Sequence, residues 1–137
     1  MSASFKLHIL AADRALYEGD CVSLTLPTGD GRLGLLANHA PLVAAIVPGR
    51  LSCRLPDGGA LDAVVGAGLV RFEKNDALLL LDGAALPEEL DAAAERDNLA
   101  RAREALLQAP AGVRREQARE ELSWAEARLR AAEKQRD

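Results

Sequence analysis

The sequence has few of the residues from which catalytic and metal sites are built. Among 137 residues there are two histidines and two cysteines, too few for a disulfide framework or a cysteine-based zinc site. No pair of carboxylates or cysteines stands near His8 or His39 in the sequence. We therefore expect no catalytic residue and no metal. So small a number of cysteines also favours a reducing, cytoplasmic compartment.

An excess of basic residues and long apolar runs are missing too. Lys and Arg total 17 against 21 Asp and Glu, which gives a net charge of −4, whereas binding to a nucleic-acid backbone depends on positive charge. Apolar runs such as Val43 to Val47 and Leu78 to Leu81 are far shorter than the about 20 residues that span a bilayer. We expect no nucleic-acid partner, no cleavable signal and no direct membrane insertion.

One glycine pattern needs to be weighed, because Gly29, Gly31 and Gly34 match the spacing of a dinucleotide-binding motif. That motif requires a helix directly after the glycines, whose N-terminus binds the phosphates. Pro41 and the β-branched residues beyond it oppose a long helix there. We interpret these glycines as turn residues with the backbone freedom that a turn needs.

The composition changes near Leu86. Residues 1–86 hold ten of the eleven glycines and nearly all of the Val, Ile, Phe and Tyr, which is typical of strands and turns. Apolar and polar residues alternate from Phe5 to Ile9 and from Val22 to Leu26, the period of half-buried strands. Several short strands at this spacing predict a small antiparallel sandwich or barrel.

Residues 87–137 differ, with 13 alanines and 22 charged residues, so strong helix formers dominate. The pattern predicts one helix from Pro87 to Gln108 and a second from about Val113 to Lys134, with Pro110 and Gly112 between them. The short connection predicts an antiparallel helical hairpin.

Both expected helices carry an apolar seam at helical spacing. Leu99, Ala102 and Leu106 form the first, and Ala118, Leu122, Ala125, Leu129 and Ala132 form the second. Trp124 starts another stripe with Ala127 and Ala131, which either packs on the β part or is reserved for another chain. Burying each large apolar side chain gains roughly 1.5–3 kcal/mol, while ordering each residue costs roughly 1–2 kcal/mol. We therefore expect a marginally docked hairpin that can move.

A segment in the β part resembles a known family. Gly31-Arg-Leu-Gly-Leu-Leu-Ala-Asn-His-Ala-Pro-Leu42, followed by Pro48-Gly49, closely resembles the epsilon subunits of bacterial F-type rotary ATP synthases. The family has a Gly-x-Leu-Gly turn, an apolar pair, His-Ala-Pro-Leu and then Pro-Gly. The resemblance covers the whole chain, because Gly66-Ala67-Gly68 and the break near Leu86 fall where the family has a Gly-Gly and its domain boundary.

The resemblance implies an α+β fold. An N-terminal antiparallel β-sandwich of about ten strands, residues 1–86, would precede a C-terminal antiparallel two-helix hairpin, residues 87–137. It also implies a non-catalytic central-stalk subunit that couples the catalytic head to the membrane rotor through gamma and contributes to ATP synthesis driven by a proton gradient. The hairpin is a mobile arm in this family, and it inhibits ATP hydrolysis when it extends into the head.

Partners and contact residues follow from the same resemblance. The partners would be gamma, the c-subunit rotor ring and, with the arm extended, the catalytic alpha and beta subunits, at the cytoplasmic face of the bacterial inner membrane. His39, Ala40 and Pro41 would contact gamma, and Arg32 lies in the turn associated with the rotor ring, where the family often has an acid. The arginines expected to contact the head are Arg101, Arg103, Arg114, Arg115 and Arg119.

Some members of the family bind ATP on the folded arm through the pattern Ile/Leu-Asp-x-x-Arg-Ala. The resemblance makes Asp91 and Arg101 the candidate ATP-binding residues here. However, Ala94 and Glu95 stand where the pattern has Arg and Ala, so a cation for the phosphates is lost and an anion is gained. We expect no cofactor and little or no ATP binding.

Two other function classes are compatible with the composition. One is an unrelated interaction module made of a sandwich with a helical tail, and the other is a small nucleotide-dependent enzyme that uses the glycine turn. Neither accounts for His39-Ala-Pro-Leu42.

Overall fold

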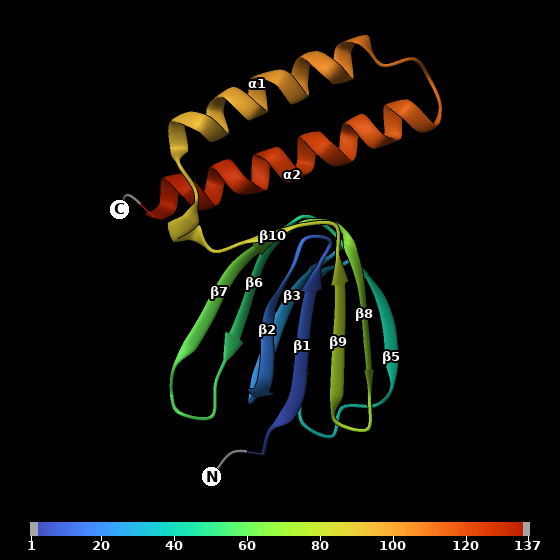
Figure 1. Ribbon diagram of the computed structural model, residues 1–137. Coiled ribbons are helices and arrows are strands. Elements are labelled where there is room, and N and C mark those ends of the chain that lie inside the picture. The colour runs from blue at the N-terminus through green and yellow to red at the C-terminus, as the bar shows by residue number, and fades with distance from the viewer. Residues whose placement is uncertain (1–2, 136–137) are drawn as a thin grey trace.

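The computed structural model describes residues 3–135, in which ten strands form two facing sheets and two helices lie across one end of them (Figure 1). The strands are β1 Phe5–Ala11, β2 Arg14–Cys21, β3 Ser23–Thr28, β4 Gly31–Leu36, β5 Leu42–Ile46, β6 Gly49–Arg54, β7 Ala60–Val65, β8 Gly68–Glu73, β9 Asp76–Leu81 and β10 Ala84–Ala85. A 3-10 turn, η1 Pro87–Glu89, precedes the helices α1 Ala92–Gln108 and α2 Val113–Gln135. The expected fold class is confirmed.

Each sheet has five strands. The first has the order β2-β1-β9-β8-β5 and the second the order β10-β7-β6-β3-β4. All neighbouring strands in the two sheets are antiparallel except β1 and β9, which run parallel with Lys6 opposite Asp76. Strands β5 and β4, which follow one another along the chain, are therefore edge strands of different sheets.

Side chains that alternate along the strands fill the space between the sheets. Phe5, Leu7 and Ile9 of β1 are buried, as their spacing predicted, and the ring of Phe5 meets the ring of Phe72 edge-on at 5.3 Å. The two cysteines lie in the same core with their Sγ atoms 2.8 Å apart, so both act as packing residues within the sandwich.

Short turns connect the strands as the sequence indicated. Lys74 and Asn75 both have positive φ angles, 50° and 57°, which is the backbone of the two-residue turns that match the twist of a hairpin. Asn38 also has a positive φ, 70°. Its backbone N–H donates to Oδ1 of Asn75 over 2.6 Å, so the β4–β5 loop is tied to the β8–β9 turn.

The first helix begins later than predicted. Pro87 does start a helical turn, but that turn ends at Glu89 because Leu90 is extended, with ψ 142°. Asp91 then caps a new helix, and its carboxylate accepts a hydrogen bond from the N–H of Ala94. A side-chain cap of this kind satisfies a backbone donor that a helix start leaves free, so Asp91 sets the true start of α1.

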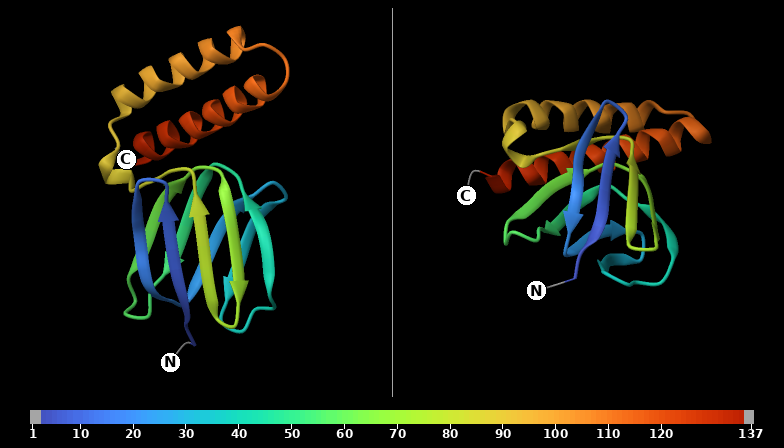
Figure 2. Two further views of the ribbon diagram at one scale, coloured as in Figure 1. Left: turned by 45° about the vertical axis from the view of Figure 1, so that its right-hand side comes forward. Right: turned by 60° about the horizontal axis from the view of Figure 1, so that its bottom comes forward.

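Trp124 joins the helical hairpin to the sandwich. A Cβ atom built on Gly83 would lie 3.2 Å from Trp124, and one built on Gly66 would lie 3.6 Å from it. Ala127, one turn further along, is buried. Helix α2 thus lies against the sandwich and α1 lies on its far side (Figure 2). Of the two alternatives for the Trp124 stripe, the structure shows packing on the β part.

A second link lies at the start of the arm. The guanidinium of Arg14 in β2 donates two hydrogen bonds to the carboxylate of Glu89 in η1, over 2.9 and 3.0 Å. These bonds lower the pKa of Glu89. The carboxylate therefore stays ionised and bound to Arg14 down to more acidic pH than a free glutamate would.

Gly68→Ala should destabilise the sandwich. A Cβ at position 68 would meet the backbone oxygen of Leu80 at 2.1 Å. A backbone atom in a central strand can move aside only if hydrogen bonds to the neighbouring strands are distorted, which costs free energy. We expect the free energy of unfolding in urea to fall by about 1–3 kcal/mol. Gly34→Ala is the matched control, because no atom lies within 4 Å of that Cβ. Equal stabilities of the two variants would contradict the prediction.

Candidate interaction surfaces

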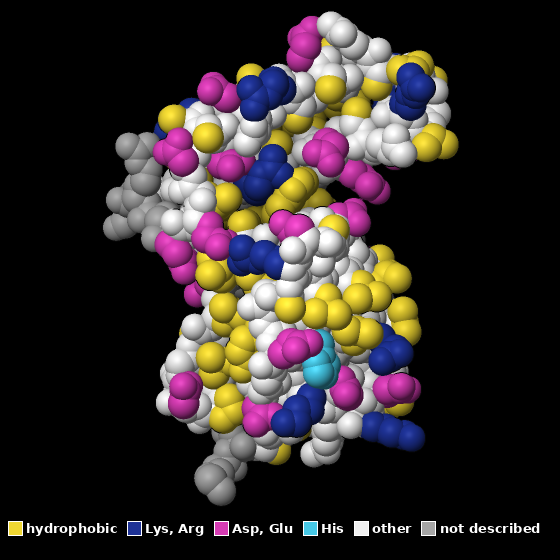
Figure 3. Space-filling view, viewed as in Figure 1, with side chains coloured by type: hydrophobic (Ala, Val, Ile, Leu, Met, Phe, Trp, Pro, Cys, Tyr) yellow, Lys and Arg dark blue, Asp and Glu magenta, His cyan; other side chains and the backbone are white. Residues whose placement is uncertain are grey.

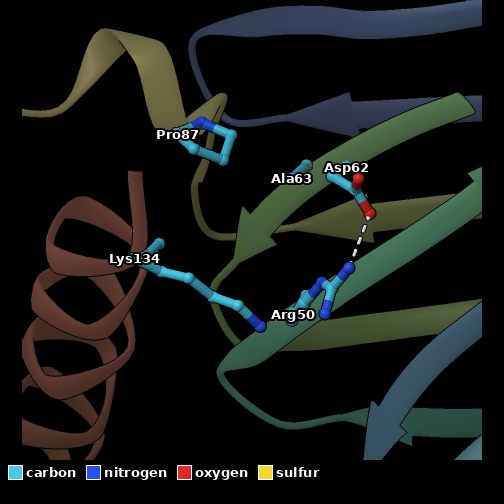
Figure 4. Close-up of a pocket in the computed structure, with 6 residues that line it drawn as sticks. Arg50, Asp62, Ala63, Pro87 and Lys134 are labelled. Carbon is cyan, nitrogen blue, oxygen red and sulfur yellow. Dashed lines mark hydrogen bonds and ion pairs between the residues drawn. The ribbon is translucent and has the colours of Figure 1, made fainter. Parts of the chain in front are cut away.

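The described residues hold little that could perform catalysis. Among residues 3–135 no three histidine, cysteine or acidic side chains are placed to hold a metal ion. One pocket of about 190 Å³ lies between the sandwich and the end of α2. Its walls include Arg50, Asp62, Pro87 and Lys134, with Arg50 paired to Asp62 over 3.2 Å (Figure 4). Arg50 and Asp62 form an ion pair in this pocket, and the long side chain of Lys134 is exposed. The pocket is therefore a gap where the sandwich meets the helices.

Apolar side chains gather instead on the outer face of the first sheet (Figure 3). Ala45, Leu69, Leu80 and Leu10 are successive cross-strand neighbours on β5, β8, β9 and β1. We call these four residues the outer row. Leu69 is 52% exposed and Leu80 is 50% exposed. Exposed apolar residues that are contiguous across several strands typically mark a contact surface for another protein.

The next row on the same face is mixed in character. Val43, which is 70% exposed, lies opposite Arg71, and Arg71 lies opposite Leu78, the neighbour of His8. The ring nitrogens of His8 lie 3.6 Å from Glu18 and 3.4 Å from Asp76. Charged groups therefore border the outer row on this side, as polar residues border the apolar centre of many interfaces.

His39, Ala40 and Pro41 adjoin this face. They form the exposed end of the β4–β5 loop, directly before β5. The ring of His39 packs edge-on against Phe72 at 5.8 Å, and its Nδ1 lies 2.7 Å from the carbonyl oxygen of Ala40. The loop is thus fixed in place next to Val43, at the end of the sandwich away from the helices.

Arg32 lies elsewhere. It belongs to β4, the edge strand of the second sheet, and its guanidinium donates to the carbonyl of Arg50 over 2.7 Å. Arg50 lines the pocket beside the helices. The structure therefore separates Arg32 from His39, Ala40 and Pro41, which lie toward the opposite end of the sandwich.

The arginines of the arm are mostly engaged in local bonds. Arg119 pairs with Glu116 over 2.7 Å, and Arg115 donates to the carbonyl of Ala109 at the end of α1. Arg103 lines a hollow between the two helices, and Arg114 is exposed in the first turn of α2. In the folded arm these side chains act within the hairpin or face solvent.

Asp91 and Arg101 do not converge on one pocket. The carboxylate of Asp91 caps α1, and the guanidinium of Arg101 donates to the side chain of Asn98. They are ten residues apart, which on an α-helix is about 15 Å along the axis and about 80° in direction. One phosphate group cannot reach both side chains in this arrangement.

The sequence interpretation missed the contact between Glu95 and Arg128. Glu95 is 7% exposed, and its Oε1 accepts a hydrogen bond from Nε of Arg128 in α2 over 2.8 Å. The signal was present, because Glu95 lies four residues before Leu99 and so extends the apolar seam of α1. A charged residue on a buried seam needs a partner.

Comparison with known proteins gives the family. A family model described as the beta-sandwich domain of the ATP synthase delta/epsilon chain matches residues 4–87. The chain belongs to this family. It is 36% identical to the ATP synthase epsilon chain of Dichelobacter nodosus over 82% of this chain and 78% of that relative. It is 30% identical to the epsilon chain of Thioalkalivibrio sulfidiphilus over 99% and 97%.

Solved structures of ATP synthases contain similar chains. One is a chain of the Euglena gracilis mitochondrial ATP synthase, in a structure of OSCP, F1 and c-ring, with a TM-score of 0.76, 25% identity, and 96% and 82% of the two chains covered. Another is from the central stalk and c-ring of the Tetrahymena thermophila enzyme, with a TM-score of 0.66 and 12% identity over 99% and 98%. This second likeness supports the fold alone.

The outer row also had a sequence signal. Leu78 to Leu81 form an unbroken apolar run in β9, whereas a strand with one solvated face alternates. A continuous run is typical of strands covered on both faces, and here residues 3–135 leave half of Leu80 uncovered. Neither helix between residues 3 and 135 is long and apolar enough to cross a bilayer.

Leu79 and Leu80 should differ sharply in their effect on stability. Leu79 is fully buried and its neighbour Leu80 is half exposed. We expect Leu79→Ala to lower the free energy of unfolding by about 2–5 kcal/mol and Leu80→Ala to change it by about 0.5 kcal/mol, measured by urea unfolding. A large loss in both variants would mean that the outer row packs inside this chain.

Proposed function

We propose that this chain is a non-catalytic subunit of the central stalk of an F-type ATP synthase, which couples the catalytic head to the membrane rotor through gamma. Membership of the delta/epsilon family supports this role, as does the likeness to a chain in an F1 and c-ring assembly. The chain itself carries out no reaction in this role, and it contributes to ATP synthesis driven by a proton gradient. It acts as a peripheral subunit at the cytoplasmic face of the bacterial inner membrane.

The exposed outer row is the observation that carries the docking proposal. Leu69 and Leu80 are half exposed, and a fixed loop presents His39, Ala40 and Pro41 toward the other end of the same sheet. We propose that gamma covers this face, with residues 1–86 sufficient for docking. Covering half-exposed leucines removes apolar surface from water, at about 25 cal/mol per Å². Arg32, toward the other end of the sandwich, is proposed to face the rotor ring.

The helical hairpin is proposed as the regulatory arm. In its folded position the seam leucines of both helices face one another, and Leu99 is buried. When the arm extends, alpha, beta and gamma would have to cover the seam leucines, because leaving these apolar side chains in water would disfavour the extended state. The proposed head contacts are those of Arg101, Arg103, Arg114, Arg115 and Arg119. ATP has little support as a regulatory ligand, since Asp91 and Arg101 are about 15 Å apart along α1.

Charges placed in the outer row should weaken docking to gamma. We expect the double variant Leu69→Asp, Leu80→Asp to bind gamma roughly ten-fold or more weakly than the unaltered chain, because two carboxylates would be buried without partners. The measurement is the dissociation constant from biolayer interferometry with gamma immobilised.

Ala60→Asp, an exposed position in the second sheet, is the matched control and should bind as the unaltered chain does. Equal affinity of all three proteins would show that gamma docks elsewhere.

Removal of the arm should release ATP hydrolysis. We expect a chain that ends at Leu86 to raise the ATPase rate of the assembled complex by about two-fold or more, since the inhibited state needs the extended arm. Proton-driven synthesis should be largely unchanged. Both rates are measured in membrane vesicles at matched occupancy of the subunit and without activating detergent.

Unchanged hydrolysis at equal occupancy would leave the arm without an inhibitory role. Binding of the shortened chain to gamma, measured in the same vesicles, separates that outcome from a simple loss of the subunit.

A further inference from the structure

Glu95 is the only charged side chain that is buried in the part of the chain described. Its Oε1 atom accepts hydrogen bonds from Nε of Arg128 over 2.8 Å and from Nδ2 of Asn98 over 3.2 Å. The side chain of Arg128 is itself only 17% exposed. A carboxylate in such surroundings is tolerated only with its cation in place, because removing either partner leaves the other charge buried and unpaired. The pair therefore ties α1 to α2.

Arg128 makes a second contact that continues this connection. Its guanidinium carbon lies 4.8 Å from the ring centre of Trp124, within the range in which a cation is attracted to an indole face. Trp124 in turn lies against Gly83 and Gly66, and the N–H of Gly66 donates to the carbonyl of Gly83 over 2.8 Å. A continuous set of contacts thus runs from α1 through Glu95, Arg128 and Trp124 to the sandwich.

We propose that Glu95, Arg128 and Trp124 form a clasp that holds the arm folded and makes its release a single concerted step. Lifting α2 from the sandwich removes Trp124 from its glycines and Arg128 from its protected position. Parting α1 from α2 breaks the ion pair directly. Parting the helices leaves Glu95 without the cation that permits its burial, and lifting α2 takes Trp124 away from Gly66 and Gly83. The clasp therefore favours the fully closed arm over partly open ones. Glu95 and Arg128 are positioning residues in this scheme.

The clasp also explains how the folded arm is stabilised without a ligand. Arg128 is a cation between the helices, and the carboxylate of Glu95 already satisfies it. A negatively charged molecule that bound Arg128 would have to displace the carboxylate of Glu95, which would then lose its cation. The closed state is therefore held by the chain's own side chains. This inference rests on the proposed function of the arm as a regulator, but the clasp can be tested without the complex.

The test uses the single tryptophan of the full chain as its own probe. We expect Glu95→Gln to raise the rate of trypsin cleavage in the arm about ten-fold, and to increase acrylamide quenching of Trp124 fluorescence. Glu104→Gln is the matched control, because among residues 3–135 that carboxylate accepts a hydrogen bond only from Gln108 in the same helix, and it should change neither quantity. Unchanged cleavage and quenching in Glu95→Gln would overturn the clasp.

A charge exchange separates the pair from the two residues taken singly. Arg128→Glu alone should open the arm, while the double variant Glu95→Arg, Arg128→Glu should restore at least part of the protection from trypsin, because the ion pair is rebuilt in reverse. Two residues with independent packing roles would give a double variant worse than either single one, and that result would also overturn the proposal. Circular dichroism of each variant checks that the strands remain folded.

The assembled complex distinguishes the clasp from the regulatory role. Glu95→Gln is expected to deepen the inhibition of ATP hydrolysis about two-fold, since more of the arm is then free to extend. If trypsin shows an opened arm while hydrolysis is unchanged, the clasp stands and the inhibitory function of the arm fails. If the arm stays closed in the isolated chain, the clasp fails and the function of the arm is untouched.

Discussion

One indole ring determines how the two parts of the molecule fit together. Trp124 can approach the sandwich closely because two glycines face it, and a Cβ on Gly83 would lie 3.2 Å from the ring. Its other neighbour, Arg128, is shielded by that contact and can hold Glu95 within the hairpin. The position of α1 thus depends on its contact with Arg128 of α2. The position of α2 depends in turn on Gly66 and Gly83, which have no side chain and so leave room for the indole ring.

The outer row and the helical hairpin occupy different parts of the fold. The outer row lies on the outer face of the sheet that contains β1, β9, β8 and β5, while the hairpin lies across one end of both sheets (Figure 1). A partner bound on the sheet face need not touch Trp124 or Glu95. The two regions meet where Ala45 of the outer row and residues of α2 line one hollow, so a partner on this face would lie next to the start of α2.

Local sequence patterns predicted much of this structure, but they did not predict contacts between residues that lie far apart in the sequence. The alternation from Phe5 to Ile9 identified β1, because that pattern depends on a few neighbouring residues. The parallel pairing of β1 with β9 joins the two ends of the sandwich sequence and leaves no local trace. The Glu95–Arg128 contact was missed because the seams were traced through apolar residues alone. The first helix was started at Pro87, since proline and acids open helices, but the extended Leu90 and the cap at Asp91 decided otherwise.

The bond between Arg14 and Glu89 would set the geometry of the proposed extension of the arm. It fastens the 3-10 turn to β2, so the pivot for α1 is the extended Leu90 that follows. Helices of 17 and 23 residues hang from that pivot, and at 1.5 Å per residue they would measure about 60 Å if laid end to end. Were the arm to extend as proposed, a single residue beside an anchored turn would carry a lever about 60 Å long.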